Sequence, residues 1–165
     1  MCSANHCAAI GGENVDKLEV LKRSDVFREL TDEQLGVVEK MCTVEVFETG
    51  TIICKQNRIE GKAYVIEEGL VGIILEVGPL AQRQVQAVCN FETFGWSALI
   101  PPYTCTATAK ALEKTTALGF DGQQMCDLCV TKPEIGCRVC RAVARVVATR
   151  LRQAYTQLLG VSSQD

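Results

Sequence analysis

Ten cysteines and a single histidine are the residues of this 165-residue chain with the most evident capacity for chemistry. Four of the cysteines form two Cys-x2-Cys motifs separated by seven residues, Cys126 with Cys129 and Cys137 with Cys140. Paired motifs of this kind hold zinc or an iron–sulfur cluster when the intervening segment can fold four thiolates around one site. Thiol redox chemistry and burial as small apolar side chains are the two other interpretations. The spacing alone leaves all three open.

A further group of metal-ligating side chains, Cys2, His6 and Cys7, lies near the N-terminus. Three such residues are too few for the usual cluster, and residues 1–15 have no hydrophobic periodicity, so they are predicted to be a flexible arm. Because His6 is the only histidine, a cysteine nucleophile in the body would lack a histidine base. A Gly-rich phosphate loop, a zinc-protease motif and a serine elbow are also missing from the sequence. We expect the chain not to be an enzyme.

The composition indicates one folded domain, with 47% hydrophobic and 22% charged residues. The longest run without charge, residues 93–109, contains Pro101-Pro102, so no membrane span is expected. The N-terminus lacks the basic patch and apolar run of a secretory signal, which favours a cytoplasmic location, where disulfide frameworks are rare. Residues 1–134 carry a net charge of −7 and residues 135–165 a net charge of +4, which argues against a nucleic-acid surface over the whole molecule.

The elements that must position these residues begin with two short helices. Apolar positions in residues 18–27 fit short helical turns, and Thr31 with Gln34 forms a capping box that starts a helix reaching about Met41. The apolar period then changes from helical to two. Strands are predicted near residues 44–46, 52–53, 64–74 (two strands with a turn at Glu68-Gly69), 84–88, 106–111 and 115–120. This pattern indicates an all-β body, a sandwich or a barrel.

Two helices are predicted after the β-body. Asp121 starts a short helix to about Val130, and residues 133–159 form a long helix of about seven turns. In the long helix, residues at alternating spacings of three and four form the a/d pattern of a coiled coil: Cys137, Cys140, Ala144, Val147, Leu151, Ala154 and Leu158. We call this set the seam, and it predicts a homodimer. A second row, Val139, Val143 and Val146, is predicted to face the β-body.

Other interpretations of this helix stay open. An amphipathic helix packed only on its own domain would need just one apolar stripe. Five arginines and no acid between residues 135 and 164 would suit nucleic acid or an acidic partner, but a solvated face beside the seam is favoured. Periodicity already accounts for Cys137 and Cys140, so burial is favoured over a redox or metal role. Oxidation across a symmetric seam would nevertheless lock a dimer if the two sulfurs met.

The order of these elements resembles the cyclic-nucleotide-binding domain, the sensory domain of the catabolite activator protein and other Crp-Fnr regulators. The resemblance is carried by Tyr64-Val-Ile-Glu-Glu-Gly69, Phe94-Gly-Trp-Ser-Ala-Leu99 and Thr106-Ala-Thr-Ala-Lys-Ala111, and it covers roughly residues 18–159. It implies a mainly β fold with flanking helices, a β jelly-roll barrel plus a long C-terminal dimerisation helix. The domain would span residues 16–160, with the jelly roll at about 42–120, the C-terminal helices at about 122–159 and a tail at 161–165.

The resemblance also implies where a ligand would bind. In the family a short helix holds the cyclic phosphate with its backbone amides, while a glutamate binds the ribose and an arginine binds the phosphate. Here Trp96 stands in place of the glutamate and Cys105 in place of the arginine, or Thr104 if the alignment shifts by one. Trp96 would fill the pocket or stack on a different ligand. The implied ligand-binding residues are Gly95, Trp96, Ser97, Ala98, Thr104, Cys105 and Thr106, with Arg150 from the long helix.

The sequence therefore favours a stand-alone regulatory or sensor domain that acts as a homodimer and binds an unusual small ligand or none. Family transcription factors continue into a helix-turn-helix domain, whereas this chain ends at Asp165, so direct DNA binding is not expected. Three alternatives remain. One is a redox or metal sensor, with metal at Cys126, Cys129, Cys137 and Cys140. Another is a structural dimerisation module, and the last is a genuine cyclic-nucleotide binder with a modified cassette. No cofactor is predicted with certainty.

Overall fold

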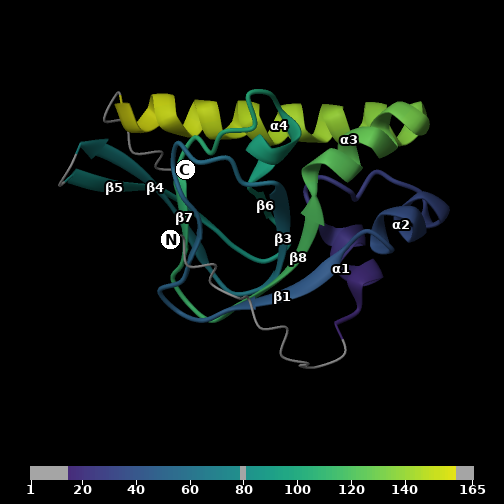
Figure 1. Ribbon diagram of the computed structural model, residues 1–165, viewed down its shortest axis with the longest axis horizontal. Coiled ribbons are helices and arrows are strands. Elements are labelled where there is room, and N and C mark those ends of the chain that lie inside the picture. The colour runs from purple at the N-terminus through teal and green to yellow at the C-terminus, as the bar shows by residue number, and fades with distance from the viewer. Residues whose placement is uncertain (1–14, 79–80, 159–165) are drawn as a thin grey trace, which may run out of the picture.

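Two four-stranded antiparallel sheets form the centre of the computed structural model, which describes residues 15–78 and 81–158 (Figure 1). The first sheet has the order β1-β8-β3-β6 and the second the order β2-β7-β4-β5. The strand bounds are β1 Thr43–Phe47, β2 Ile52–Cys54, β3 Lys62–Glu68, β4 Val71–Gly78, β5 Ala81–Val88, β6 Thr93–Phe94, β7 Thr108–Ala111 and β8 Thr115–Asp121. The predicted mainly β fold with flanking helices is confirmed.

Four α-helices flank the sheets in the described residues: α1 Lys17–Arg23, α2 Asp32–Glu39, α3 Gly122–Thr131 and α4 Pro133–Leu158. Both predicted helix starts are present. Gln34 N–H donates to Thr31 Oγ1 at 3.3 Å while Thr31 N–H donates to Gln34 Oε1 at 3.1 Å, and Gln124 N–H donates to Asp121 Oδ1 at 2.9 Å. These caps satisfy amides that a helix start leaves without partners. Helix α2 ends at Glu39, two residues before the predicted Met41.

The turn between β3 and β4 shows why its glycine is needed. Gly69 has a φ of +122°, and a Cβ there would approach Thr115 Oγ1 to 2.5 Å. Only glycine adopts this backbone without strain, so the predicted Glu68-Gly69 turn joins two strands as expected. The sequence pattern missed β6, because two residues are too few to show a period of two.

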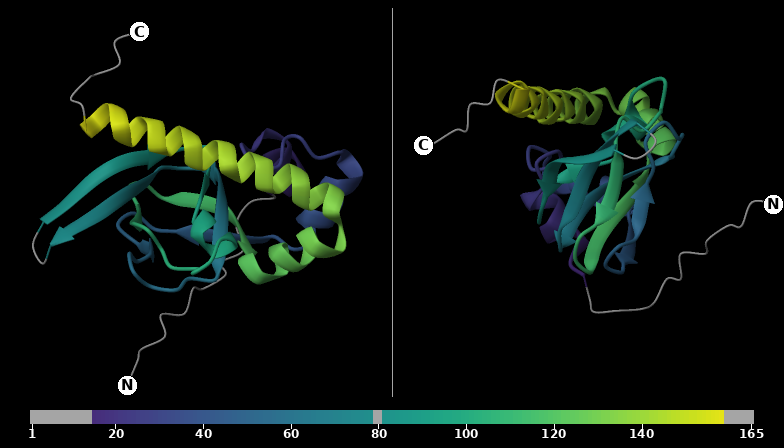
Figure 2. Two further views of the ribbon diagram at one scale, coloured as in Figure 1. Left: turned by 90° about the horizontal axis from the view of Figure 1, so that it is seen from above. Right: turned by 90° about the vertical axis from the view of Figure 1, so that its left-hand side faces the viewer.

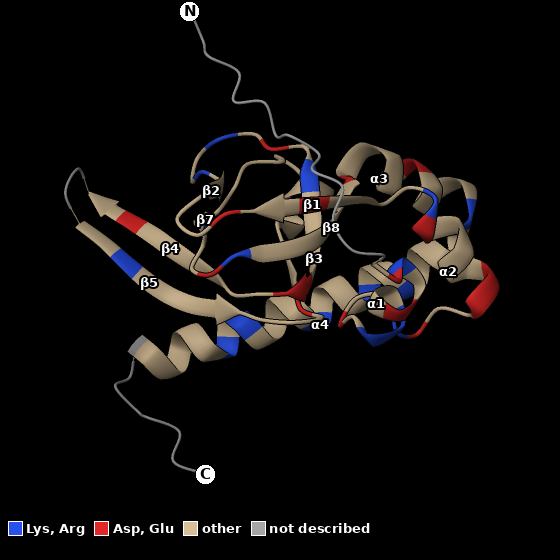
Figure 3. Cartoon of the chain, turned by 90° about the horizontal axis from the view of Figure 1, so that it is seen from below, with Lys and Arg blue, Asp and Glu red and all other residues tan. Residues whose placement is uncertain are grey.

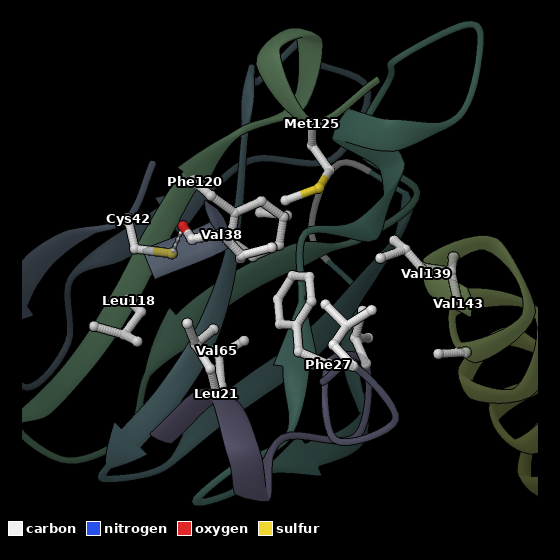
Figure 4. Packing of buried hydrophobic residues seen from close by; sticks show 14 of the residues in the cluster. Leu21, Phe27, Val38, Cys42, Val65, Leu118, Phe120, Met125, Val139 and Val143 are labelled. Atoms are coloured by element: carbon white, nitrogen blue, oxygen red, sulfur yellow. Dashed lines mark hydrogen bonds between the residues drawn. The ribbon is translucent and has the colours of Figure 1, made fainter. Parts of the chain in front are cut away.

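Two hydrophobic clusters hold the molecule together. The first joins the helices to one sheet and includes Phe27, which packs edge-on against Phe120 with ring centroids 5.4 Å apart (Figure 4). The second lies between the sheets, where Tyr64 stacks on Phe94 and meets Phe47 edge-on. Interdigitated aromatic rings of this kind contribute beyond the area they bury. The β-body is therefore a packed sandwich whose first sheet carries the helices.

Helix α4 lies along one side of the molecule (Figures 1 and 2). The predicted inner row, Val139, Val143 and Val146, is buried in the first cluster. The seam lies on another face: Cys137, Cys140, Ala144, Leu151 and Ala154 are exposed, Val147 is half-buried, and the side chain of Leu158 lies outside the description. The helix thus has two apolar faces, of which its own domain covers only one.

Figure 3 shows Lys and Arg positions along α4, and three of its arginines contact the rest of the chain. Arg138 Nη1 donates to the Glu29 carbonyl at 2.5 Å, and Arg145 forms an ion pair with the Glu29 carboxylate at 2.6 Å. Arg150 reaches the main chain of β6. The sequence could not show this, because Glu29 lies more than 100 residues from these arginines along the chain. In the described residues, no helix has the length and apolar character that crossing a membrane requires.

Candidate functional site

A pocket opens between the second sheet, the segment 95–97 and α4. Its volume is about 300 Å³ when space open to solvent is counted, and the enclosed part is far smaller. The residues that line it are Cys54, Ile73, Gly95, Trp96, Ser97, Cys105, Thr106, Ala107, Ala109 and Arg150. Its walls are mostly apolar, and Arg150 is the one charged side chain among these described residues.

Gly95 determines the path of the segment at the pocket wall. It has a φ of +74° and precedes a short 3₁₀ helix, η1 (Trp96–Leu99). A Cβ at residue 95 would lie 2.9 Å from the Lys62 carbonyl oxygen, so no larger residue fits beside β3. Ala98 N–H donates back to the Gly95 carbonyl at 3.0 Å. One of the backbone amides that the family uses for an anion is therefore engaged within η1 itself.

Arg150 enters the pocket from α4 with its guanidinium group already in use. Its Nη2 donates to the carbonyl of Thr93, the first residue of β6. The same threonine is held from the other side by Asp25, whose carboxylate accepts from Thr93 N–H at 3.2 Å and from Thr93 Oγ1–H at 2.5 Å. Burial lowers the pKa of Arg150, while Asp25 and Glu92 favour its charged form. The two acids thus offset part of the cost of burying this positive charge.

A thiol pair forms another part of the pocket wall. Cys54 from β2 and Cys105 from the segment before β7 are both buried, and Cys105 lies close enough to affect the ionisation of Cys54. Burial and the neighbouring Cys105 raise the pKa of Cys54 to about 12. Cys54 is therefore a neutral thiol at physiological pH. A neutral thiol cannot balance a phosphate charge, so this wall favours uncharged ligand groups.

Six of the eight ligand-binding residues expected from the resemblance line this pocket: Gly95, Trp96, Ser97, Cys105, Thr106 and Arg150. Ala98 instead packs in the first cluster, and Thr104 bonds locally to the Pro102 carbonyl at 3.4 Å. Trp96 both lines the pocket and packs against the first cluster. Whether it fills the site or stacks on a ligand stays a prediction. Sequence reasoning missed Cys54, Ile73, Ala107 and Ala109. The pairing of β2 with β7 and of β7 with β4 brings them there, and no local motif encodes it.

The four cysteines of the Cys-x2-Cys motifs lie on α3 and α4 and do not line the pocket. In the described part of the chain, no group of three or more Cys, His, Asp or Glu side chains is arranged to hold a metal ion. Cys137 is exposed on α4, while Cys126 and Cys129 lie half-buried on α3. The metal alternative, which needs all four thiols around one ion, therefore gains no support from this arrangement. Cys2, His6 and Cys7 lie outside the described residues.

Comparison with solved structures shows the same architecture elsewhere. A cyclic nucleotide-binding protein from Geobacter metallireducens, described as putative by its depositors, is 27% identical, with a TM-score of 0.73 over 84% of this chain and 99% of the other. The N-terminal domain of a transcriptional regulator from Streptomyces coelicolor is 25% identical, with a TM-score of 0.67 over 92% of this chain and 99% of that domain. The Thermus thermophilus catabolite activator protein, 23% identical, shares the fold with a TM-score of 0.70 over 82% of this chain and 62% of its own length.

The comparison with protein families covers most of the sandwich. No curated protein matches the chain. The profile of the cyclic nucleotide-binding domain matches residues 44–132, more than half of the chain and all eight strands except the first residue of β1. The match includes η1, the pocket segment 104–107 and the start of α3. Together with the fold, this match shows that the chain belongs to the cyclic nucleotide-binding domain family.

Proposed function

We propose that this chain is a homodimeric regulatory domain whose pocket takes a small ligand less anionic than a cyclic nucleotide. The observation that carries the proposal is the state of Arg150. Its guanidinium donates to the Thr93 carbonyl and is faced by the carboxylates of Asp25 and Glu92. A phosphate would compete with these nearby carboxylates for the guanidinium, which weakens the attraction that it meets.

The residues at the two recognition positions support the same conclusion. Trp96 and Cys105 stand where the family resemblance implies a glutamate for the ribose and an arginine for the phosphate. Losing a buried charged hydrogen-bond partner costs about 2–5 kcal/mol, a factor of about thirty to several thousand in affinity. A ligand with an apolar face against Trp96, Ile73 and Ala109 avoids this cost.

The dimer part of the proposal rests on α4. Its inner row is buried in the domain core, whereas Ala144, Leu151 and Ala154 of the seam stay exposed. Cys137 and Cys140 are left out of the proposed interface, because Cys140 lies beside Cys129 of α3. Coiled-coil spacing of small and apolar residues favours a second copy of the same helix as the partner. Arg150 immediately precedes the seam residue Leu151, so a ligand that changes the Arg150 contacts would act on the helix that carries the seam. Such a ligand shifts an equilibrium between two helix positions.

The proposal is tested by titrating the protein with cyclic AMP and cyclic GMP in a calorimeter. Wild-type protein is expected to bind both more weakly than micromolar. A double variant, Trp96→Glu with Cys105→Arg, restores both missing groups and is expected to bind more tightly than wild type. Arg141→Gln, an exposed α4 position outside the pocket, serves as the control. Micromolar or tighter binding by the wild-type protein would contradict the proposed ligand class.

A further inference from the structure

Three thiols gather where α3 packs on α4, away from the pocket. Cys126 and Cys129 come from α3, and Cys140 comes from α4. Cys129 packs directly against Gly136, one turn before Cys140 on α4. Cys140 and Cys126 both lie close enough to Cys129 to affect its ionisation. All three are free thiols in this structure. The cluster therefore contains both cysteines of the first Cys-x2-Cys motif and one cysteine, Cys140, of the second.

The packing of the two helices explains why these thiols meet. Gly136 lies one turn before Cys140 on α4, and a Cβ there would be 2.6 Å from the Cys129 carbonyl oxygen. The two backbones can approach this closely only because residue 136 is glycine. Residues four apart share a helix face, so Gly136 directs Cys140 toward the same part of α3. The contact between Cys129 and Cys140 is thus built into the helix pairing.

We propose that Cys129 and Cys140 form an intrachain disulfide when the protein meets a hydroperoxide. Exposed Cys140 reacts first: its thiolate sulfur attacks the peroxide O–O bond, giving a sulfenic acid and releasing water or an alcohol. The Cys129 sulfur then attacks the sulfenic sulfur, the S–S bond forms, and the departing hydroxide takes the Cys129 proton as water. Two electrons pass from the two thiols to the peroxide.

The environments of the two residues agree with this order. Cys140 is exposed, whereas Cys129 is half-buried. Burial and the neighbouring Cys140 and Cys126 raise the pKa of Cys129 to about 11. Cys129 therefore stays protonated in the reduced protein and does not compete with Cys140 for the peroxide, and it must lose its proton as it attacks the sulfenic sulfur. Peroxide-sensitive cysteines typically pair an accessible thiol with a nearby resolving one.

The disulfide would fix α3 to α4 at a structurally central point. In the reduced protein, Cys126 Sγ donates to the Leu99 carbonyl at 3.7 Å, and Leu99 ends η1. Helix α3 therefore connects η1, whose first two residues line the pocket, to the part of α4 where the seam begins. A covalent link at Cys129 would limit relative movement of α3 and α4. The inference is independent of the ligand proposed above.

Peptide mapping by mass spectrometry tests the proposal. Reduced protein is treated with one equivalent of hydrogen peroxide, residual thiols are blocked with N-ethylmaleimide, and the protein is digested without reduction by trypsin, Glu-C and Asp-N proteases. Cleavage before Asp127 and after Glu134, Arg138 and Arg141 leaves each cysteine of the two motifs on its own peptide. The expected product links peptide 127–134 to peptide 139–141.

Variants separate this pair from its neighbours. Cys129→Ser and Cys140→Ser should each abolish the linked peptide, whereas Cys137→Ser, one turn before Cys140 on α4, should retain it. Absence of the 127–134 to 139–141 link in wild-type protein would overturn the proposal. So would a chain-to-chain disulfide through Cys137 or Cys140 as the main product on a non-reducing gel. N-ethylmaleimide labelling of untreated protein is expected to modify Cys140, and an unlabelled Cys140 would also overturn it.

Discussion

Gly122 shows how a single side-chain position controls contact between the pocket segment and the C-terminal helices. It is the first residue of α3, directly after the cap Asp121. A Cβ at this position would overlap the Ala98 carbonyl of η1, which is backbone and cannot rotate away. Gly122 N–H also donates to the Gly61 carbonyl at 2.8 Å. Close packing of α3 on η1 therefore depends on a missing methyl group.

Replacing Gly122 with alanine is expected to destabilise the fold by about 1–3 kcal/mol, the usual cost of forcing an extra methyl into a packed site. Gly36→Ala is the matched control, because a Cβ in α2 at that position would contact nothing within 4 Å. It should stabilise by about 0.5–1 kcal/mol, since alanine favours a helix interior more than glycine does. Urea denaturation of both variants measures the difference between their free energies of unfolding. Equal values would show that η1 can move away from the added methyl group at no cost.

Cys42 gives the fold a dependence on alkaline pH. The residue is 4% exposed, and its thiol donates to the Val38 carbonyl at 3.3 Å. Burial raises the pKa of Cys42 from its ordinary value of 9.0 to about 11, with Lys17 opposing the shift and Glu39 adding to it. Below pH 9 both folded and unfolded chains keep the proton. Between pH 9 and 11 the unfolded chain releases it first, so folding stability falls.

The free energy of unfolding is expected to fall by about 1.4 kcal/mol per pH unit between pH 9 and 11. Cys42→Ala should lack this part of the slope, although it is less stable at neutral pH because it leaves a cavity. Denaturation of wild-type and variant protein at several values between about pH 8 and 10 provides the measurement. Cys137→Ala, at an exposed position, is the control and should keep the wild-type slope. Parallel curves for wild type and Cys42→Ala would contradict the expected role of this thiol.

Residue-scale prediction succeeded where the signal is local and failed where it is not. The caps at Thr31 and Asp121 were predictable because donor and acceptor lie three residues apart. The Cys54–Cys105 contact was not, because it depends on how β2 pairs with β7. Arg150 was expected at the pocket only through the family resemblance. Its bond to Thr93, which determines how much charge it offers a ligand, joins residues 57 apart.

At the scale of elements, α4 is held to the domain by its inner row and by two contacts to Glu29. Val139 is 2% exposed within the first cluster, beside Phe27. Arg138 and Arg145 both bind Glu29, and Arg145 is the main cause of the lowered pKa of the Glu29 carboxyl. Exposed ion pairs of this kind contribute little. The apolar row should therefore dominate the attachment of the helix.

Val139→Ala should lower the stability of the fold by about 1–3 kcal/mol, through lost burial and the cavity left behind. Val130→Ala removes the same atoms at a position that is 79% exposed on α3, and it should change stability by less than about 0.5 kcal/mol. Thermal unfolding monitored by circular dichroism compares the two. Equal effects would mean that α4 is not anchored through this row.

The long helix was the most predictable element, and the short segments were the least. The apolar residues in 133–158 repeat with a helical period over about seven turns, so many residues support the prediction of one long helix. β6 has two residues and η1 four, and their positions depend on contacts with β3 and α3. The pocket lies among these short segments. The residues of its framework were therefore predictable from family motifs. Its depth and the thiol pair in its wall could be seen only in the structure.

At the scale of the whole molecule, basic residues of the C-terminal segment contact the acidic body of the same chain. Residues 135–165 carry a net charge of +4 and the remainder −7. In the structure, Arg145 pairs with the Glu29 carboxylate, Arg138 donates to the Glu29 carbonyl, and Asp25 and Glu92 lie close enough to Arg150 to favour its charged form. Much of the basic segment is thus satisfied within the chain. This leaves the apolar seam, rather than a positive surface, as the feature of α4 that a partner would recognise.

That seam leads to a prediction about the assembled molecule. Leu151 is 49% exposed on α4, near the middle of the seam residues that follow Cys140. In a symmetric dimer it would be buried against a second copy, so Leu151→Asp would place charges at the centre of the interface. Sedimentation velocity is expected to give a dimer for wild-type protein and a monomer for Leu151→Asp, with unchanged circular dichroism for the variant.

The same substitution at an exposed apolar residue outside the seam separates a specific interface from general stickiness. Val130→Asp, on α3, should remain dimeric, because Val130 is 79% exposed and is not part of the seam. A monomeric wild-type protein, or a Leu151→Asp variant that stays dimeric, would contradict the seam as the dimer interface. Loss of the dimer in both variants would indicate that α3 also takes part, since α3 packs directly against the start of α4. Because Arg150 and Leu151 are neighbours on one rigid helix, the dimeric form is also the one in which pocket and interface can influence each other.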